Sequence, residues 1–543
     1  MRRLIMLVML LTWLVAPTIT LAQRSGWSTP FELSPPQTPT SPDGTAERVY
    51  GSSWFPDLTA APDGTLFASW YSGKRLDARE GGSLDLLMLR AMRAGSWGPI
   101  GEVLAPATGG LTVRNAIVVA RDGRLHAVYR SNTSIVHASA PFDQADDPAS
   151  WSQPTRLSGF GAAYYVALEA DSRGSLHAFF SESMPDDPAI PNQICPGCSD
   201  LFYRRSTDGG RTWSVPLNLS TTLEGENRPQ VQVDQFDRIH VVWDEGIDWY
   251  AGRGEPRAGV YRRSDDGGLT WSEPVRFQLP ERAVAQLRRS REQGPGSAPP
   301  RHLDAVVQTT LGLDGQGNPL VVFRGAYWDR IYSTISRDGG TTWEQPVELA
   351  GLIARQSDLD SYSMATDGSG MVHLLVAAYQ PAGYTGDPFA PIGLWHLTWN
   401  GRSWVGRESV MNNELYPEWP RLIVNGGNQL HAVWFTRSRD DLFQSERARY
   451  RVWYSNRSTN APAVVPLPLF TPTPLPVVAP TAPPQAVELP IPTALPEVIV
   501  TAPPMLARPA WEAPGLLLVG LALAPVVLLL GGILLFRALR GRR

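Results

Sequence analysis

The chain has 543 residues, of which 43% are hydrophobic and 18% are charged, and its formal net charge is −4. This nearly balanced charge argues against a nucleic-acid-binding protein, which usually carries a basic face. The 49 glycines, 49 prolines and 19 tryptophans favour short strands joined by tight turns, and the 2 cysteines exclude a disulfide scaffold.

The chain begins with a segment typical of exported proteins. Residues 1–22 hold two arginines near the start, then a long apolar run, then small residues before Ala22. This order predicts a secretory signal peptide cleaved after Ala22, with a retained membrane anchor as the alternative. We therefore expect the folded part of the chain to lie outside the cytoplasm.

One unit of two strands recurs between residues 26 and 458. It consists of an apolar strand, a turn that contains Asp, Asn or Gly, and a second strand rich in apolar and aromatic residues. Side chains alternate along segments such as LHAVW with the period of a strand. Seven copies begin near Pro62, Arg121, Ser172, Gln235, Gly315, Gly368 and Asn425. Their spacing is close to that of propeller blades.

A second unit alternates with the first and begins with a tryptophan. The tryptophan precedes a short polar stretch and then an apolar residue. Six copies begin at Trp97, Trp151, Trp213, Trp271, Trp343 and Trp404, and a seventh, Trp27, precedes the first two-strand unit. This count predicts an all-β propeller of seven four-stranded blades, with six blades as the alternative. The N-terminal strand would complete the last blade and close the ring, which removes exposed sheet edges.

Three of the turns before these tryptophans share the Asp-box pattern S-x-D-x-G-x-T-W. Their aspartates are Asp208, Asp266 and Asp338, and their tryptophans are Trp213, Trp271 and Trp343. The aspartate of such a turn can accept bonds from backbone N–H groups, and glycine supplies a positive φ. We therefore interpret the three motifs as structural turns, each anchored to the sheet by its tryptophan.

The long connections of this arrangement fall on one face. The turns inside the two-strand units share a face with the Asp-boxes, so the longer loops lie on the opposite face, where function usually sits. Arginine, carboxylate and aromatic side chains that begin the inner strands should line the channel mouth there and suit an anionic or sugar-like ligand. They are Trp54, Asp57, Arg114, Tyr164, Tyr165, Arg228, Arg301, Asp304, Asp360, Tyr362, Glu418 and Arg421.

Cys195 and Cys198 form a CxxC motif in one of the long loops. Such a motif can be redox-active, half of a zinc site, or a local disulfide. We predict a disulfide that pins the loop, because the chain has no second cysteine pair and is expected to be exported.

Five histidines recur mid-strand at equivalent positions of different blades, and these are His126, His177, His240, His373 and His431. Because they are spread around the ring, we interpret them as packing or hydrogen-bonding residues. The sequence predicts no metal site and no cofactor.

The C-terminal part of the chain changes character. Residues 461–510 are rich in proline and almost free of charge, which predicts an extended polyproline stalk. Residues 515–536 are apolar and uncharged over about the length of a membrane-spanning helix. Four arginines within residues 537–543 follow, which places that tail in the cytoplasm. The predicted organisation is therefore a signal peptide (1–22), an extracellular propeller (23–460), a stalk, one membrane helix and a cytoplasmic tail, at the cell membrane.

The Asp-boxes resemble those of the sialidase superfamily of BNR-repeat propellers. The resemblance covers residues 26 to about 458 and is closest in the segment from Ser53 to Arg90. Sialidase chemistry uses a Tyr nucleophile with a Glu partner, an acid/base Asp and an arginine cluster. The resemblance casts Tyr362, Glu418 and Asp77 in the catalytic roles, and Arg114, Arg228 and Arg421 in ligand binding. Trp54 stands where the family has its first arginine, and a tryptophan cannot form the same bidentate pair with a carboxylate.

These features lead to two functional interpretations. The first is a surface-anchored, sialidase-like propeller that binds glycans, with hydrolysis as an open question. The second is a non-catalytic propeller for protein binding or adhesion. The expected partners are a glycan or a surface protein and, through one helix, a membrane, but not nucleic acid.

Overall fold

The computed structural model describes residues 26–35, 50–75, 83–105, 114–159, 161–183, 197–220, 222, 224–248, 252–292, 300–357, 359–382, 384, 386–387, 390–412, 416–437 and 450–470. The chain divides after Thr473, and Met1–Thr473 form one compact unit. All of the described residues belong to the first unit.

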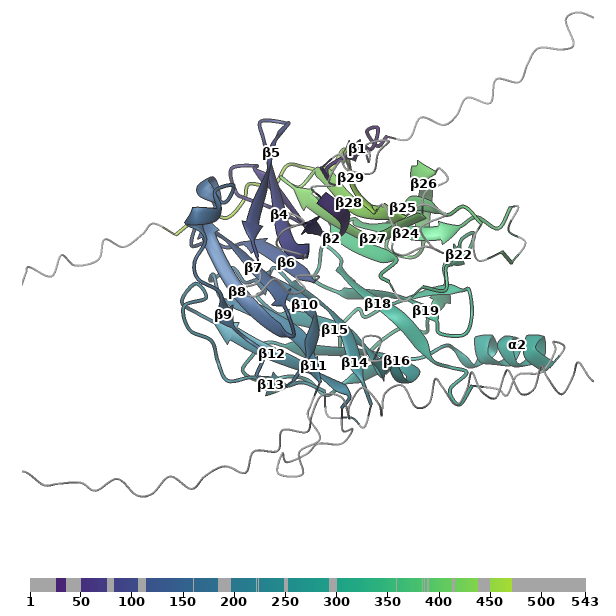
Figure 1. Ribbon diagram of the computed structural model, residues 1–543. Coiled ribbons are helices and arrows are strands. Elements are labelled where there is room, and N and C mark those ends of the chain that lie inside the picture. Colours follow the sequence, from purple (N-terminus) through teal and green to yellow (C-terminus); the bar gives the residue numbers. More distant parts are fainter. Residues whose placement is uncertain are drawn as a thin grey trace, which may run out of the picture. The chain divides into compact units, whose positions relative to one another are not determined.

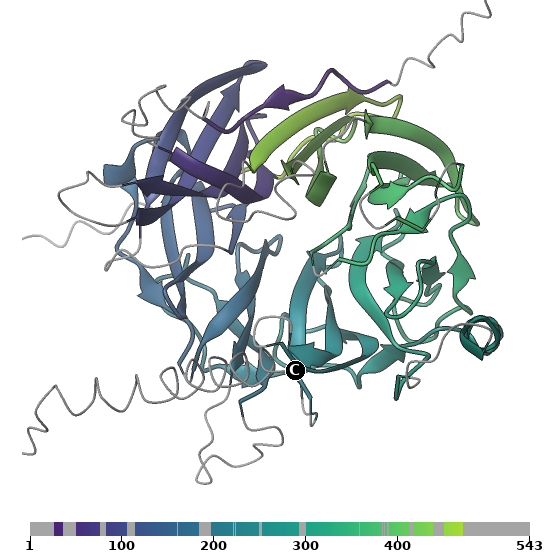
Figure 2. The same ribbon diagram turned by 45° about the vertical axis from the view of Figure 1, so that its right-hand side comes forward.

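The strands of these residues form seven antiparallel sheets, arranged as blades around a central axis (Figures 1 and 2). The first three blades, from the inner to the outer strand, are β2 (Tyr50–Ala60), β3 (Leu66–Arg75), β4 (Ser83–Arg93) and β5 (Ser96–Leu104); β6 (Asn115–Val119), β7 (Arg124–Ser131), β8 (Ser134–Pro141) and β9 (Thr155–Arg156); and β10 (Ala163–Ala170), β11 (Leu176–Ser183), β12 (Ser199–Ser206) and β13 (Leu217–Asn218). The predicted all-β propeller of seven blades is confirmed.

The other four blades follow in chain order. They are β14 (Glu226–Val233), β15 (Ile239–Asp248), β16 (Arg253–Ser264) and β17 (Val275–Phe277); β18 (Val306–Leu313), β19 (Pro319–Gly325), β20 (Ile331–Ile335) and β21 (Val347–Glu348); β22 (Ile353–Ala354), β23 (Tyr362–Thr366), β24 (Val372–Tyr379), β25 (Gly393–Trp399) and β26 (Trp404–Asn412); and β27 (Tyr416–Asn425), β28 (Gln429–Arg437), β29 (Arg451–Ser458) and β1 (Phe31–Glu32). The sixth blade has five strands because β22 and β23 both pair with β24. The described helices are η1 (Phe142–Gln144), η2 (Pro148–Ser150) and α2 (Glu281–Glu292).

The N-terminal strand closes the ring, as the displaced tryptophan unit predicts. In β1, Phe31 pairs with Tyr454 and Glu32 with Trp453, so the outermost strand of the last blade comes from the start of the chain. Trp27 is buried in a cluster of apolar residues from the sixth and seventh blades. Closure therefore depends on contacts between residues more than 400 positions apart, which hold both ends of the propeller in one blade.

The core lies between the blades. Side chains of a strand alternate between the two faces of its sheet, so each blade presents one apolar face to each neighbour. The largest of these side chains, such as Trp70, Trp243 and Trp434, are at most 1% exposed. The seams between blades are thus filled with close-packed aromatic and aliphatic groups.

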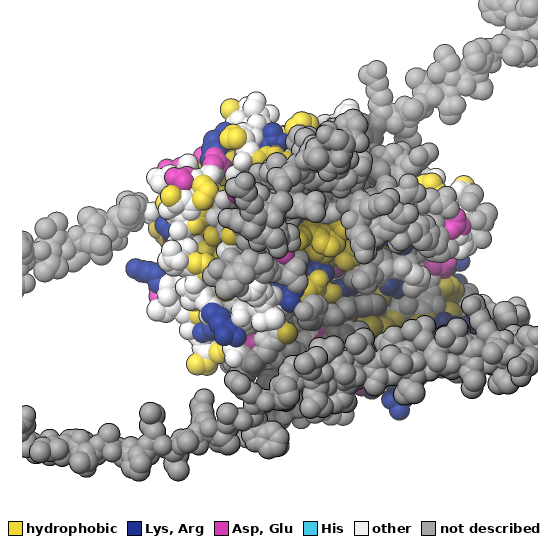
Figure 3. Space-filling view, viewed as in Figure 1, with side chains coloured by type: hydrophobic (Ala, Val, Ile, Leu, Met, Phe, Trp, Pro, Cys, Tyr) yellow, Lys and Arg dark blue, Asp and Glu magenta, His cyan; other side chains and the backbone are white. Residues whose placement is uncertain are grey.

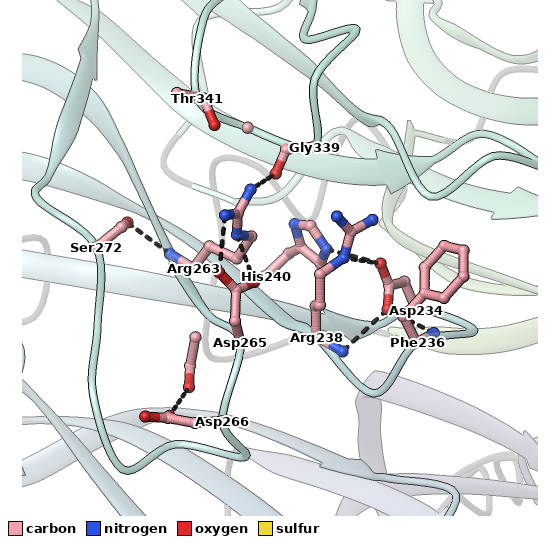
Figure 4. A network of polar contacts seen from close by, with 12 residues as sticks. Asp234, Phe236, Arg238, His240, Arg263, Asp265, Asp266, Ser272, Gly339 and Thr341 are labelled. Atoms are coloured by element: carbon pink, nitrogen blue, oxygen red, sulfur yellow. Dashed lines mark hydrogen bonds and ion pairs between the residues drawn. The ribbon is translucent and has the colours of Figure 1, made fainter.

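A hydrogen-bonded chain recurs where the first and second strands of a blade meet. In the fourth blade Asp234 Oδ2 lies 3.4 Å from His240 Nε2 (Figure 4). His240 Nδ1 lies 2.8 Å from the Tyr261 hydroxyl. Burial raises the pKa of Asp234, but the bonds from His240 and Arg238 outweigh it and hold the pKa at about 2. The same aspartate–histidine contact joins Asp171 to His177 and Asp367 to His373.

The recurring histidines thus make hydrogen bonds within the blades, as expected. No group of three or more His, Cys, Asp or Glu side chains among the described residues is arranged to hold a metal ion.

The aspartates of the outer turns accept several bonds within their own turn. Asp266 accepts bonds from the Ser264 hydroxyl at 2.8 Å, from the Thr270 N–H at 2.9 Å and from the Thr270 hydroxyl at 2.6 Å. Asp208 and Asp338 accept the equivalent set from their own turns. Each aspartate therefore replaces the backbone partners that a tight turn lacks.

None of the helices in the described part of the chain is long and apolar enough to cross a membrane. The predicted signal peptide, the membrane helix at 515–536 and the basic tail all lie outside the described residues. Of the predicted stalk, residues 461–470 are described.

Candidate binding site at the start of the inner strands

The inner strands of five blades begin with a β-bulge, where the pairing register shifts. In four of them a bulky residue takes a positive φ, namely Phe55 at 52°, Arg228 at 59°, Gln308 at 59° and Trp419 at 54°. Such a backbone is strained for a residue other than glycine, and strain of this kind gathers at functional sites. A bulge also changes the direction of the side chain at that position, and the same change recurs in these separate blades.

Arg114 lies inside a cage of four aromatic rings that come from three blades. The carbon of its guanidinium lies 3.7 Å from the ring centroid of Phe55 and 4.5 Å from that of Trp419. Tyr164 and Tyr165 complete the cage at 4.6 Å and 4.9 Å. Aromatic faces stabilise a cation, but they offer no acceptor to its N–H groups.

The donors of Arg114 are unsatisfied in this cage. The residue is 3% exposed, and its Nε and Nη1 atoms have no hydrogen-bond partner among the described residues. A buried cation in this state costs stability unless an acceptor reaches it. Because two of its donors are unsatisfied, Arg114 is the side chain of the site that an anionic partner would stabilise most.

Arg228 and Arg421 differ from Arg114 because aspartates face them. Arg228 lies 3.6 Å from Asp244 and 4.0 Å from Asp360, and it is 3% exposed. Arg421 lies 3.1 Å from Asp360 and 3.9 Å from Asp57, with its side chain 23% exposed. Asp360 thus lies between the two arginines and ties the fourth, sixth and seventh blades together.

A cavity of about 1290 Å³ follows the channel from this cluster toward the turns of the two-strand units. Its lining includes Asp57, Glu169, Gln230, Gln232 and Arg421. Burial raises the pKa of Glu169 to about 7. The bond from the Ala170 N–H lowers this pKa, whereas the nearby negative charge of Asp57 raises it further. Burial also raises the pKa of Asp57, although Arg421 lowers it. The cavity is therefore polar, with a carboxyl group that titrates near neutral pH.

Trp54 belongs to the outer aromatic part of the same site. Its ring stacks on Phe55 at 4.9 Å and lies 4.8 Å from the Tyr450 ring and 5.6 Å from the Tyr71 ring. The Tyr71 hydroxyl donates to Asp85 at 2.7 Å, so the group is fixed by a buried polar bond. Figure 3 shows hydrophobic side chains at the centre of this face, with charged ones beside them.

The residues cast in catalytic roles make different contacts in the structure. Tyr362 is fully buried in the core between the fifth and sixth blades, where burial raises the pKa of its hydroxyl. Glu418 is ion-paired with Arg355 and with Arg437. No hydrogen bond joins Tyr362 to Glu418 within the described residues, and Asp77 lies outside them.

Two further predicted residues, Arg301 and Asp304, precede β18. Arg301 is exposed, and the carbonyl of Asp304 accepts a bond from the Leu279 N–H at 2.8 Å. Cys198 is disulfide-bonded, and Cys195, the one other cysteine of the chain, lies outside the described residues.

The sequence reasoning missed Phe55, Gln308, Trp419 and Glu169 as parts of the site. A signal for two of them was present, because Phe55 and Trp419 each precede a proline at the start of an inner strand, as Arg228 does. Proline restricts the residue before it and removes a ladder donor, so this pair marks a break in strand pairing.

No family model matches the chain, and a search of curated proteins finds no match. Among solved structures the chain is similar to an ulvan lyase from a new family of polysaccharide lyases, with 14% identity, a TM-score of 0.45, and 76% and 96% of the two chains covered. It is also similar to the Trypanosoma rangeli sialidase (13%, TM-score 0.39, 79% and 59%) and to the NanB sialidase from Streptococcus pneumoniae (10%, TM-score 0.42, 76% and 94%). Sialidases are thus among the similar structures, as the Asp-boxes indicate.

Proposed function

We propose that this protein is a propeller that binds anionic glycans at the start of its inner strands. The observation that carries the proposal is the Arg114 guanidinium, buried among aromatic rings with two of its nitrogens unsatisfied. Carboxylate and sulfate groups fit the planar donors of arginine. The half-buried rings of Trp54 and Tyr164 beside this cage offer apolar faces on which sugar rings can pack.

The arrangement of the described residues favours binding over hydrolysis. Glu418 is neutralised by two arginines, and the Tyr362 hydroxyl is enclosed in the core. A nucleophile needs an adjacent base and access to the substrate, and Tyr362 has neither in this state. We therefore propose a lectin-like role for the propeller, tethered to the cell surface by the apolar segment at 515–536.

The proposal is tested with the full-length protein on an array of carboxylated, sulfated and neutral glycans, followed by fluorogenic glycosides. We expect binding of the charged glycans, weakened by salt, without turnover. Arg114→Met keeps the apolar volume inside the cage and removes the donors. It should weaken binding by roughly ten- to a hundredfold while the protein stays folded.

Arg211→Met is the matched control, because Arg211 is an exposed arginine in an outer turn on the opposite face. It should leave binding unchanged. If folded Arg114→Met binds as tightly as the parent protein, the anion site is elsewhere. Absence of binding to every glycan would instead favour the protein-binding function.

A further inference from the structure

The chain does not leave the propeller at the end of its last strand. After β29, the Thr459 N–H donates to the Asn428 carbonyl at 2.8 Å, and the Val464 N–H donates to the Gly426 carbonyl at 2.9 Å. Both acceptors belong to the turn between β27 and β28. Residues 459–464 are therefore held against the seventh blade by backbone bonds, on the face of the inner turns.

The same segment is attached again at the second and third blades. The Phe470 N–H donates to the Arg121 carbonyl at 2.7 Å, and the Arg121 side chain donates to the Pro468 carbonyl at 2.9 Å. The Arg121 guanidinium also lies 4.4 Å from the Phe470 ring centroid. Figure 1 shows this yellow-green end of the described chain passing behind the ring and leaving beside β8.

Glycines make room for the segment at both attachments. A Cβ atom on Gly427 would lie 2.7 Å from Val464, and one on Gly174 would lie 2.7 Å from the Phe470 ring. A Cβ on Gly368 would lie 2.9 Å from Val464 Cγ2 and closer still to the Pro462 carbonyl. Contacts this short do not occur with real side chains, so the inner turns are shaped to receive the segment.

The two attachments lie on either side of the first blade, one on the seventh blade and the other on the second and third blades. Val464 itself lines the cavity, together with the inner turns of the sixth blade around Gly368. Between the attachments the side chains face outward, and Val465 and Leu467 are 88% and 55% exposed. The prolines at 462, 466 and 468 favour an extended conformation, which suits a segment that must span an opening.

We infer that residues 459–470 form a strap that closes the inner-turn end of the central cavity. The strap also joins the seventh blade to the second and third, across the seam at which the ring closes. Release of the strap opens the cavity from this face, whereas Asp57 and Arg421 line the cavity toward the start of the inner strands. This inference does not depend on glycan binding.

Hydrogen exchange of the full chain tests the strap. The amides of Val464 and Phe470 should exchange at least about tenfold more slowly than unstructured amides. Gly368→Ala should abolish this protection, because Gly368 has no left-handed φ and its new methyl group meets only the strap and the neighbouring turn. Phe470→Ala, which alters no inner turn, should have the same effect at Phe470. Val465→Ala is the matched control and should change nothing.

Access to the cavity is measured with a single thiol. The described residues contain no free cysteine, and Ala365 lines the cavity, so Ala365→Cys supplies a specific site for a soluble thiol reagent. Labelling should be slow with the strap intact and about tenfold faster with Phe470→Ala added. Intrinsic exchange rates across 459–470 in the parent, or equal labelling with and without Phe470→Ala, would overturn the inference.

Discussion

The three arginines at the head of the inner strands show how neighbours decide the role of a side chain. Arg228 and Arg421 each face two aspartates, and both share Asp360. Arg114 faces aromatic rings and has unsatisfied donors. An arginine that is paired with aspartates fixes the geometry of a site, whereas a buried arginine with unsatisfied N–H donors can still bind an anion. This difference is why the proposed anion contact is Arg114.

His431 shows the same principle for a titrating group. Among the five recurring histidines it is the one whose turn, at Asn425–Gly427, has no aspartate. Its Nδ1 lies 2.8 Å from the Tyr454 hydroxyl, and its Nε2 has no partner among the described residues. Burial lowers the pKa of His431 to about 4.

His431 should therefore make the propeller acid-sensitive. The unfolded chain binds a proton at this residue near pH 6.5, whereas the folded chain resists protonation until about pH 4. Stability is then fully present above about pH 6.5 and falls by up to about 3 kcal/mol as the pH drops to about 4. His431→Gln, which can still bond Tyr454, should flatten this part of the curve. Denaturant unfolding at several pH values measures the slope, and identical slopes in parent and variant would refute the assignment.

At the scale of elements, a chain of contacts through a histidine, a tyrosine and a tryptophan connects some neighbouring blades. His240 of β15 bonds the Tyr261 hydroxyl of β16, and the Tyr261 ring packs on Trp343 at 5.0 Å. Trp343 belongs to the outer turn of the following blade. One chain of contacts thus fixes the inner turn, the third strand and the outer turn of the next blade, and it recurs one blade earlier with His177, Tyr203 and Trp271.

Tyr261→Phe tests this chain without leaving a cavity. It removes the hydroxyl that contacts His240 Nδ1 at 2.8 Å and that donates to the Gly339 carbonyl at a longer 3.4 Å, and the buried His240 bond is worth about 1–2 kcal/mol. Tyr332→Phe is the matched control, since Tyr332 occupies the third strand of the next blade and makes no hydrogen bond through its hydroxyl among the described residues. Denaturant unfolding should separate the two variants. Equal losses would mean that the His240 contact adds nothing to the stability of the blades.

At the scale of the whole molecule, the sequence was a good guide to the ring and a partial guide to its centre. Two alternating units fix the number of blades, and the displaced Trp27 unit predicts the closure that β1 makes with β29. Strand direction also places Arg114, Arg228 and Arg421 at one end of the channel. These features follow from the order of turns and from the period of two in a strand, which are local properties of the chain.

The contacts of the site could not be foreseen in this way. The bulges that turn Phe55 and Trp419 toward Arg114 break the period of two, so the pattern does not show where these side chains point. The ion pairs that neutralise Glu418 come from Arg355 and Arg437, which lie on different elements. Such contacts depend on how the blades pack against one another, and the residue pattern of a single strand does not predict that packing.

Ring closure makes the stability of the propeller depend on its first residues. Trp27 is 6% exposed between the sixth and seventh blades, with its ring 5.3 Å from that of His396. Trp27→Ala should leave a cavity at this seam and cost about 3–5 kcal/mol of the free energy of unfolding. Phe31→Ala is the matched control on the same segment, because Phe31 is 46% exposed and should cost well under half as much. Thermal melting of both variants tests this prediction. If the ring is closed through Trp27, the Trp27→Ala variant should melt at a lower temperature or less cooperatively than the Phe31→Ala variant. An unchanged melting temperature for Trp27→Ala would mean that the last blade is held by β27, β28 and β29 alone.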